Sequence, residues 1–306
     1  MTVLHDFAGW PRGPLHVAIG VFDGVHVGHR ALIRAAALRA RADGGRAVAT
    51  TFDPLPIEVL ATGAPPSALS DVSERRDLLL EAGADAVAVF HFTREFAAMP
   101  PEEFARRLAG AGEVREVLVG EDFRFGRDRG GDVALLTELG ARLGFRVEVA
   151  PPVTVDGRVV SSTRIRNALL AGDVREAARL LGRRYAVTGT VEHGDKRGRA
   201  LGFPTVNLAV PINRLLPRDG IYAMWANVSG ERVAAAASLG VRLTFGAGER
   251  RLEAFLLDWS GEVYGDSVRA EFVERLRDEL SFASAGELAA QIAGDVERTR
   301  AVLRGR

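Results

Sequence analysis

The arrangement of apolar residues changes once along this chain of 306 residues, at about Tyr185. Before that point, continuous apolar runs alternate with segments of helical periodicity. Residues 15–23, for example, are predicted to form a buried strand, and residues 29–41 a helix. This alternation predicts an α/β domain whose parallel sheet is covered by helices on both faces. Ligands of such a sheet bind beyond the carboxyl ends of its strands.

After Tyr185, short β-branched runs are separated by turn residues. Strands are predicted at residues 185–192, 205–210, 221–228, 232–238, 251–258 and 267–272. Ser229-Gly230 and Ser260-Gly261 are predicted hairpin turns between strand pairs, and residues 285–303 are predicted to form a long helix. The pattern indicates an antiparallel β-barrel followed by a C-terminal helix.

The length and composition bound the kind of protein this is. The chain is long enough for two hydrophobic cores, and we predict domains at residues 1–183 and 184–306. Lysine plus arginine and aspartate plus glutamate both number 40, so no net charge favours nucleic acid or an anionic membrane as a partner. The absence of cysteine excludes disulfides and thiolate chemistry. No secretory signal begins the chain and no apolar run reaches the roughly 20 residues of a membrane helix, so a cytoplasmic location is expected. The oligomeric state stays open.

A glycine turn between the first buried strand and the first helix carries two of the six histidines. In the run Gly20-Val-Phe-Asp-Gly-Val-His-Val-Gly-His29, Gly24 permits a sharp turn and Gly28 lets the backbone approach a ligand. His26 and His29 flank Gly28 near a helix N-terminus, which attracts phosphate. Imidazole N–H groups aimed at phosphate oxygens would stabilise the charge that develops during nucleotidyl transfer. The alternatives are two unrelated loop histidines or a zinc pair, for which no third ligand is evident nearby.

A second candidate for phosphate binding lies far downstream. Ser161, Ser162 and Thr163 stand at the predicted start of a helix, and Arg164 and Arg166 follow directly. A hydroxyl at a helix start is often a cap, which is the favoured interpretation for Ser161 alone. The arginines add charge-assisted hydrogen bonds to phosphate. Together, the H-x-G-H and S-S-T-x-I-R elements resemble the paired signature of the nucleotidyltransferase superfamily.

Further motifs resemble the adenylyltransferase half of bacterial bifunctional riboflavin kinase/FAD synthetases. They are Gly20-x-Phe-Asp-Gly24, Thr51-Phe-Asp-Pro54 and Val119-Gly-Glu-Asp-Phe-Arg-Phe-Gly126. The resemblance implies a Rossmann-like nucleotidyltransferase domain that binds ATP and FMN. Among the residues it implies at the ATP phosphates are Gly20, Phe22 and Asp23. Those it implies at the flavin and nucleotide site are Phe52, Asp53, Asp122, Phe123 and Phe125. For Phe123 and Phe125, plain core packing is an equal alternative.

The barrel half carries a glycine-rich basic segment before its second strand. Its backbone amides could cradle phosphates, and its cations supply countercharge. The phosphate-binding candidates are Gly194, Lys196, Gly198 and Arg199. Thr205 and Asn207 are two residues apart on a predicted strand, so they share a face and offer Mg²⁺ hard oxygen ligands. A basic, glycine-rich hairpin is the alternative for the glycines alone.

That segment contains the run G-x-x-x-G-R-x-L-G-F-P-T-x-N-L, which is similar to the riboflavin kinase signature. The resemblance implies that Thr205 and Asn207 position Mg²⁺ and ATP. Residues 251–258 match the strand of that family that bears the catalytic base, and its glutamate aligns with Glu253. An ordinary exposed strand glutamate is the alternative.

The resemblance runs from about residue 19 to residue 300 and implies a bifunctional enzyme. Its barrel would phosphorylate riboflavin to FMN, and its α/β domain would adenylylate FMN to FAD with release of pyrophosphate, both from ATP with Mg²⁺. The chain departs from the family at Leu55, where histidine is usual, and at Leu243, where proline is usual. Two alternatives therefore stay open. One is a specialised paralogue that retains a single activity or acts on a flavin analogue, and the other is a non-catalytic regulator that binds flavin or nucleotide.

Overall fold

The computed structural model describes residues 2–192, 202–241 and 250–304. The chain forms two compact units, residues 1–162 and residues 163–306. The helix α8 (Val174–Leu181) precedes the predicted domain boundary at residues 183 and 184 but belongs to the second compact unit. The position of the functional boundary stays a prediction.

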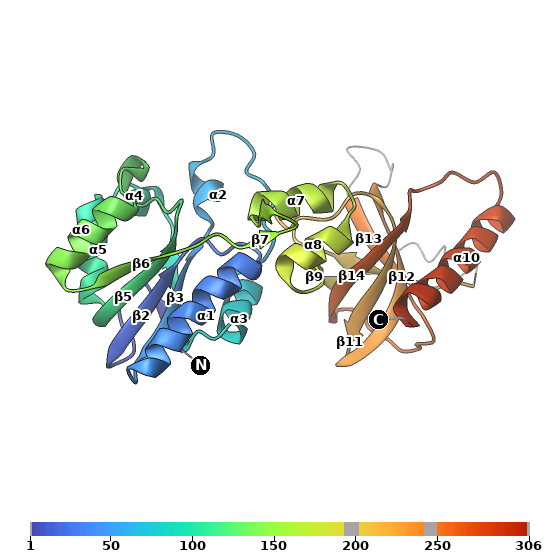
Figure 1. The fold of residues 1–306 in the computed structure, drawn as a ribbon. Helices are drawn as coiled ribbons and strands as arrows, with labels where there is room; N and C mark the ends of the chain where they lie inside the picture. The colour runs from blue at the N-terminus through green and yellow to red at the C-terminus, as the bar shows by residue number, and fades with distance from the viewer. Residues whose placement is uncertain (1, 193–201, 242–249, 305–306) are drawn as a thin grey trace. The chain divides into compact units, whose positions relative to one another are not determined.

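The first unit is built on one six-stranded sheet in which every neighbouring pair of strands is parallel (Figure 1). In spatial order the strands are β1 (Thr2–His5), β4 (Ala86–His91), β3 (Arg46–Asp53), β2 (Pro14–Ile19), β5 (Glu113–Gly120) and β6 (Arg146–Ala150). The strand order reverses at β2, which pairs with β3 on one side and β5 on the other. Loops leave such a switch point in opposite directions and open a crevice for a ligand. The predicted parallel sheet is confirmed.

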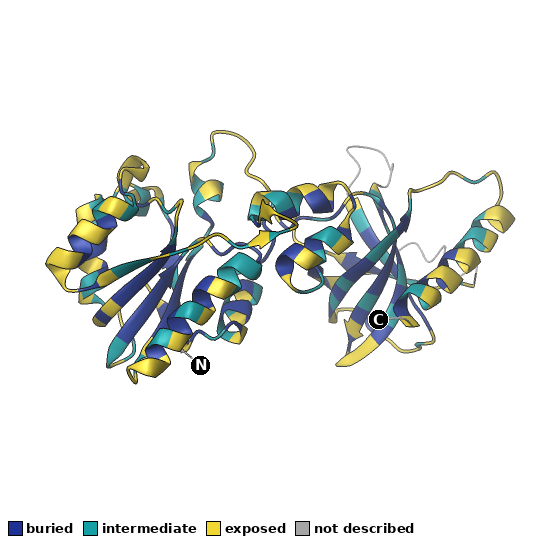
Figure 2. Ribbon diagram, in the orientation of Figure 1, coloured by how far each residue is buried: buried dark blue, intermediate teal, exposed yellow. Residues whose placement is uncertain are grey.

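Helices cover both faces of this sheet. On one face lie α1 (Val27–Ala42) and α3 (Val72–Glu81), and on the other α5 (Pro101–Gly110) and α6 (Val133–Leu143) (Figure 1). Val17 of β2 packs in the apolar cluster of α5 and α6, whereas its neighbour Ala18 packs in that of α1 and α3. A strand covered on both sides must be apolar throughout, which explains the continuous runs in the sequence. Figure 2 shows the inner strands β2, β3 and β5 largely dark blue and the outer sides of the helices yellow.

Short elements complete the first unit. They are α2 (Pro56–Leu60), α4 (Arg94–Ala97), the 3₁₀ turn η1 (Arg127–Arg129) and the small hairpin of β7 (Thr154–Val155) and β8 (Arg158–Val159). The helix α7 (Ser162–Leu170) begins at the last residue of this unit.

The second unit contains a closed barrel of six antiparallel strands, as predicted. In order around the barrel these are β10 (Thr205–Ala209), β13 (Arg250–Leu256), β12 (Glu231–Val241), β11 (Gly220–Val228), β14 (Ser267–Arg277) and β9 (Ala186–Glu192). The predicted C-terminal helix is α10 (Ala285–Arg304), which packs on β11, β12 and β14 (Figure 1).

The two predicted hairpin turns have different outcomes. Ser229-Gly230 joins the paired strands β11 and β12, and both residues have positive φ, 50° and 85°, as a tight hairpin requires. The prediction for Ser260-Gly261 is wrong, because β13 and β14 are not neighbours: β10 and β12 flank β13, and β11 and β9 flank β14. Turn residues show that the chain reverses, but the barrel closure decides which strands then pair.

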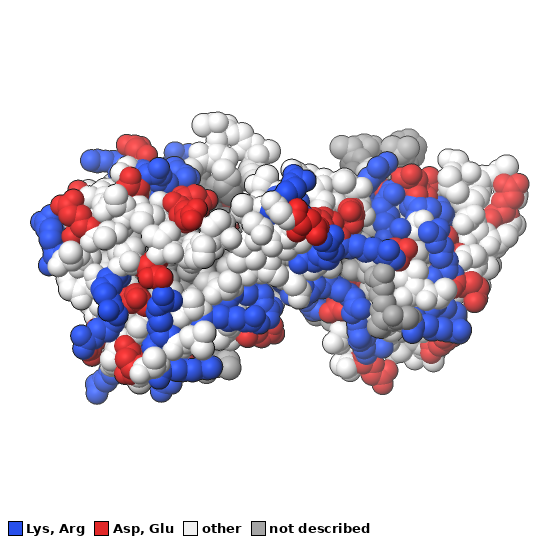
Figure 3. All heavy atoms as spheres, in the orientation of Figure 1, with Lys and Arg blue, Asp and Glu red and all other residues white. Residues whose placement is uncertain are grey.

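Basic and acidic side chains are interspersed on the visible surface of each unit (Figure 3). Among the helices that the structure describes, none is both long and apolar enough to cross a lipid bilayer.

Candidate active sites

A cavity of about 1160 Å³ lies where β2, β3, β5 and β6 end, at the carboxyl edge of the sheet. This is the position that the strand order predicts for a ligand. Of the site residues predicted from the sequence, those that line it are Gly20, Phe22, His26, Gly28, His29, Phe52, Asp122, Phe123, Phe125, Ser161 and Ser162. Four segments far apart in the sequence thus meet around one space.

The glycine turn is held in an unusual backbone conformation. Phe22 and Val25 have φ of 54° and 40°, and Gly24 has φ of 78°. A Cβ on Gly20 would lie 2.7 Å from the ring of Phe22, so any larger residue there would displace that ring. Asp23 is buried and does not line the cavity; instead its carboxylate accepts hydrogen bonds from loop backbone N–H groups, including that of Leu69 at 2.9 Å. Asp23 and Gly24 therefore shape the turn that carries the lining residues.

The two histidines stack on each other at the start of α1. Their ring centroids are 3.5 Å apart, with 18° between the ring planes. Nδ1 of His26 accepts a hydrogen bond from the backbone N–H of His29, with 3.3 Å between the nitrogens, so His26 caps the helix. That bond requires Nδ1 to be unprotonated, which places the proton of a neutral ring on Nε2. Burial, and then the neighbouring His26, lower the pKa of His29 well below its ordinary value. The ring of His29 is therefore neutral near neutral pH and can donate through one N–H. The ring of His26, whose Nδ1 accepts, can donate through Nε2.

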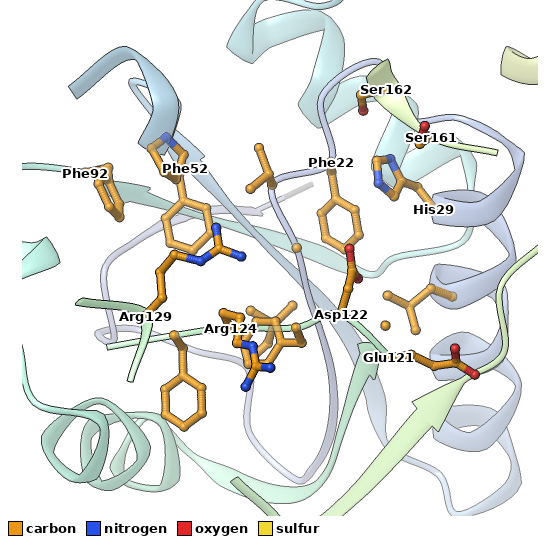
Figure 4. A pocket seen from close by; sticks show the side chains of 18 of the residues that line it. Phe22, His29, Phe52, Phe92, Glu121, Asp122, Arg124, Arg129, Ser161 and Ser162 are labelled. Carbon is orange, nitrogen blue, oxygen red and sulfur yellow. The ribbon is translucent and has the colours of Figure 1, made fainter. Parts of the chain in front are cut away.

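The opposite end of the cavity is an aromatic chamber (Figure 4). The rings of Phe123 and Phe125 stack with centroids 5.5 Å apart, and Phe52 meets Phe92 edge to face at 5.6 Å. Phe96 lies 6.1 Å from Phe52 and also lines the space. The rings pack on one another and together offer the cavity an apolar aromatic wall, which suits a flat aromatic ligand. Phe125 also packs in the main hydrophobic core, so this residue both fills the core and lines the cavity.

The segment after β3 contributes less than its motif predicts. Asp53 does not line the cavity, and its carboxylate lies 4.0 Å from the guanidinium of the fully buried Arg75. Arg75 also donates to the carbonyl oxygen of Phe52 at 2.8 Å, and burial lowers its pKa. The unusual Leu55 is buried at the start of α2 and is likewise outside the lining.

Ser161 and Ser162 line the same end of the cavity as His29 (Figure 4). Ser162 donates through Oγ to the carbonyl oxygen of Asp23 at 2.9 Å, which ties the start of α7 to the glycine turn. Thr163, Arg164 and Arg166 follow on α7, belong to the second compact unit, and are not among the lining residues. Arg164 forms an ion pair with Glu176 of α8.

The second candidate site is a row of polar residues on the outer side of the barrel. Along β13 the buried Leu252 and Ala254 alternate with the half-buried Glu253, which therefore faces outward. Asn207 of β10 stands directly opposite Glu253, and Ser238 of β12 stands opposite it on the other side. Directly opposed residues of an antiparallel pair lie about 5 Å apart at Cβ, so these side chains adjoin.

Thr205 shares the face of Asn207, as predicted, and is opposed by Phe255. Asn207 is 9% exposed, and its Oδ1 has no hydrogen-bond partner within residues 2–192, 202–241 and 250–304. The predicted phosphate-binding residues Gly194, Lys196, Gly198 and Arg199, and the departure at Leu243, lie outside the described residues.

Several lining residues of the cavity were missed by sequence reasoning. They are Phe92, Phe96, Arg94, Arg124, Arg127 and Arg129. The first three lie just after β4, so their place at the carboxyl edge was a usable signal. Arg124 lies inside the motif of residues 119–126, which was a usable signal, whereas Arg127 and Arg129 follow it in a loop whose fold no local pattern predicts.

These two sites define a class of protein. A switch-point cavity with a helix N-terminus and paired imidazoles is built to bind a nucleotide and transfer part of it. A barrel face that sets a carboxylate beside an amide oxygen suits a base next to a metal-bound phosphate. The chain is thus a two-site transferase of phosphorus-containing groups.

Comparisons with known proteins identify the family. The chain matches the family model of FAD synthetase over residues 12–164 and that of riboflavin kinase over residues 181–303. It is 37% identical to the bifunctional riboflavin kinase/FMN adenylyltransferase of Escherichia coli K12, over 95% of this chain and 94% of the relative. It is also 37% identical to that of Pseudomonas fluorescens, over 98% and 96%.

A crystal structure described as a macrolide-efflux protein from Streptococcus pneumoniae is similar in fold, with a TM-score of 0.90 and 32% identity. The match covers 98% of this chain and 99% of that one. The chain belongs to the family of bifunctional riboflavin kinase/FMN adenylyltransferases. The expected family, fold class and enzyme class are confirmed.

Proposed function

We propose that the first unit adenylylates FMN and that the barrel phosphorylates riboflavin, each with ATP. Membership of the family supports both activities. The observation that supports the division of labour is the shape of the cavity, which joins the paired histidines at the start of α1 to an aromatic chamber in one space. The proposed location is the cytoplasm, as the sequence predicts.

In the first reaction, a phosphate oxygen of FMN attacks the α-phosphorus of ATP. The new P–O bond forms FAD, and the bond to the leaving pyrophosphate breaks. Negative charge builds up on the phosphate oxygens during this step. We assign its stabilisation to the ring N–H groups of His26 and His29, the backbone amides at the start of α1 and the neighbouring Ser161 and Ser162. The neutral state of His29 leaves one ring nitrogen as a donor.

In the second reaction, the 5′-hydroxyl of riboflavin attacks the γ-phosphorus of ATP, and ADP leaves. We assign Glu253 as the base that accepts the hydroxyl proton. Its register beside Asn207 supports this role, because the base must lie close to the phosphate being transferred.

The residues on this face fit a magnesium ion. The buried Oδ1 of Asn207 is an oxygen ligand without a partner among the described residues, and Thr205 adds a hydroxyl on the same face. Within the part of the chain that the structure describes, no group of three histidine or acidic side chains could hold a metal ion. Mg²⁺ in phosphoryl-transfer enzymes is bound by few protein ligands together with water and substrate phosphates. When bound, it would offset the charge of those phosphates.

The test is incubation of the purified full chain with riboflavin, ATP and Mg²⁺, followed by chromatography of the flavins. FMN should form first and FAD later. FMN that accumulates without FAD, or FAD made only from added FMN, would indicate a paralogue with one activity. Consumption of neither flavin would indicate the non-catalytic regulator and refute the proposal.

A further inference from the structure

The loop from residue 124 to residue 132, called here the arginine loop, brings charge into the cavity that the proposed chemistry does not use. Arg124, Arg127 and Arg129 all line the cavity. Arg124 is paired with Asp132, with 3.1 Å between nitrogen and oxygen. Within the described residues, neither Arg127 nor Arg129 forms an ion pair. A guanidinium that faces a cavity without an acidic partner favours an anionic ligand.

The arginine loop is held in one shape at its base. Phe125 and Gly131 exchange two backbone hydrogen bonds, of 3.0 and 2.9 Å. The backbone N–H of Arg127 donates to the carbonyl oxygen of Met99 at 2.7 Å, which ties the loop to the segment before α5. These bonds fix the direction in which the tip of the loop points.

The tip has a conformation that side chains rarely adopt. Asp128 and Arg129 have φ of 55° and 56°, the left-handed region that disfavours residues with a Cβ. Two such residues in succession persist only where the surroundings impose them, and they gather at functional sites. Figure 4 shows the guanidinium of Arg129 reaching into the cavity, in this view between the ring of Phe52 and the carboxylate of Asp122.

Neither end of the cavity supplies a binding residue for the phosphate of FMN. The imidazoles and Ser162 lie at the nucleotide end, and the aromatic chamber accepts the flavin ring. The phosphate of FMN must lie between them, because it attacks the α-phosphorus of ATP. Asp122 also faces the cavity and would repel that phosphate unless a cation stood nearby.

On the basis of the proposed function, we infer that Arg129 binds the phosphate of FMN and so makes the adenylylation site select FMN over riboflavin. The two flavins share the ring and the ribityl chain, so the aromatic chamber cannot distinguish them. Only the phosphate differs, and the planar fork of a guanidinium matches two phosphate oxygens at once. Without this contact, riboflavin would occupy the site as an inhibitor that has no phosphate to react.

The test compares the full chain with its Arg129→Ala variant in the conversion of FMN to FAD. The inhibitor is lumiflavin, which has the flavin ring but neither the ribityl chain nor the phosphate. Loss of a charge-assisted hydrogen bond should raise the KM for FMN about tenfold to a hundredfold, and the KM for ATP and the Ki of lumiflavin should stay within about twofold. Arg129→Lys should restore part of the loss. Arg106→Ala, on the exposed side of α5, is the matched control and should change nothing.

Other outcomes would overturn the inference. A Ki of lumiflavin that rises with the KM for FMN would show that Arg129 only supports the chamber. A KM for ATP that rises instead would assign the arginine to the nucleotide. An unchanged KM for FMN would remove the role altogether. Failure of the unaltered protein to form any FAD would refute the proposed function itself, which distinguishes the two failures.

Discussion

Asn207 on β10 lies directly opposite Glu253 on β13, so an amide oxygen and a carboxylate share one outer face of the barrel. The register that pairs them also sets Ser238 on the other side of Glu253. Residues from three strands, separated by up to 46 positions in the sequence, thus adjoin through backbone pairing alone. Such rows are rigid, which is what a base and a metal ligand need in order to act on the same phosphate.

Replacement of Asn207 by alanine should raise the Mg²⁺ concentration needed for half-maximal FMN formation by about tenfold or more, because the ion loses a protein ligand. Conversion of FMN to FAD should not change. The measurement is the initial rate of FMN formation as Mg²⁺ is titrated. Thr188→Ala, at an exposed position of β9, is the control. An unchanged Mg²⁺ requirement in Asn207→Ala would contradict the assignment.

The half-buried His29 should make stability depend on pH in a definite direction. Because burial and His26 lower its pKa well below 6.5, the unfolded chain binds a proton below pH 6.5 that the folded chain does not. The free energy of unfolding should therefore fall as the pH falls below 6.5, by at most about 1.4 kcal/mol per pH unit from this group. Above pH 6.5 the group is neutral in both states and adds no dependence.

His29→Gln should accordingly lose less stability on acidification than the unaltered chain. Urea unfolding of the first unit at about pH 7 and about pH 5.5 measures the difference. His91→Gln is the control, because His91 is exposed on the sheet edge. The same loss in His29→Gln and the unaltered chain would show that His29 carries no such penalty.

The close contact between Gly20 and Phe22 gives a test of the glycine turn. A methyl group on Gly20 would lie 2.7 Å from the ring, so Gly20→Ala should displace Phe22 and the turn that presents the histidines. We expect a loss of about 1–3 kcal/mol in stability of the first unit and a slower conversion of FMN to FAD, with FMN formation unchanged. Gly63→Ala, where no atom lies within 4 Å, should have no effect. Equal rates for both variants would argue against the strained turn.

Local patterns in the sequence predicted much of the fold. A continuous apolar run such as that of β2 can be recognised as a strand from the sequence alone, because a strand that is buried on both faces must be apolar throughout. The hairpin at Ser260-Gly261 was wrong for the opposite reason: strand neighbours in a closed barrel depend on the whole ring of pairings.

Some residues of the candidate site could be predicted from the local sequence, and others could not. The glycine turn with His26 and His29 has a local signature, so it was predicted. Phe96 is marked only by its place shortly after β4, because the sheet brings the ends of its strands to one edge. Arg129 has no such signal, because a strained loop turns it into the cavity.

An ion pair contributes to the attachment of the C-terminal helix, beside the apolar contacts of Leu303. Nη2 of Arg277 lies 2.6 Å from the carboxylate of Asp295, which is 5% exposed and also accepts from Gln291. Asp295→Ala should leave the half-buried guanidinium without its carboxylate partner and lower the free energy of unfolding of the barrel by about 3 kcal/mol. Glu297→Ala, at a position 77% exposed, should change it by less than about 0.5 kcal/mol. Equal effects in urea unfolding would mean that α10 is held by apolar contacts alone.

The division of labour between the two sites is tested most directly by a crossed pair of variants, Glu253→Gln and His29→Ala, each confirmed to be folded by circular dichroism. Both reactions are measured separately, as riboflavin to FMN and as FMN to FAD. Glu253→Gln should slow the first reaction by about a hundredfold or more and leave the second unchanged, and His29→Ala should do the reverse. If either folded variant slowed both reactions equally, the assignment of one reaction to each site would be wrong.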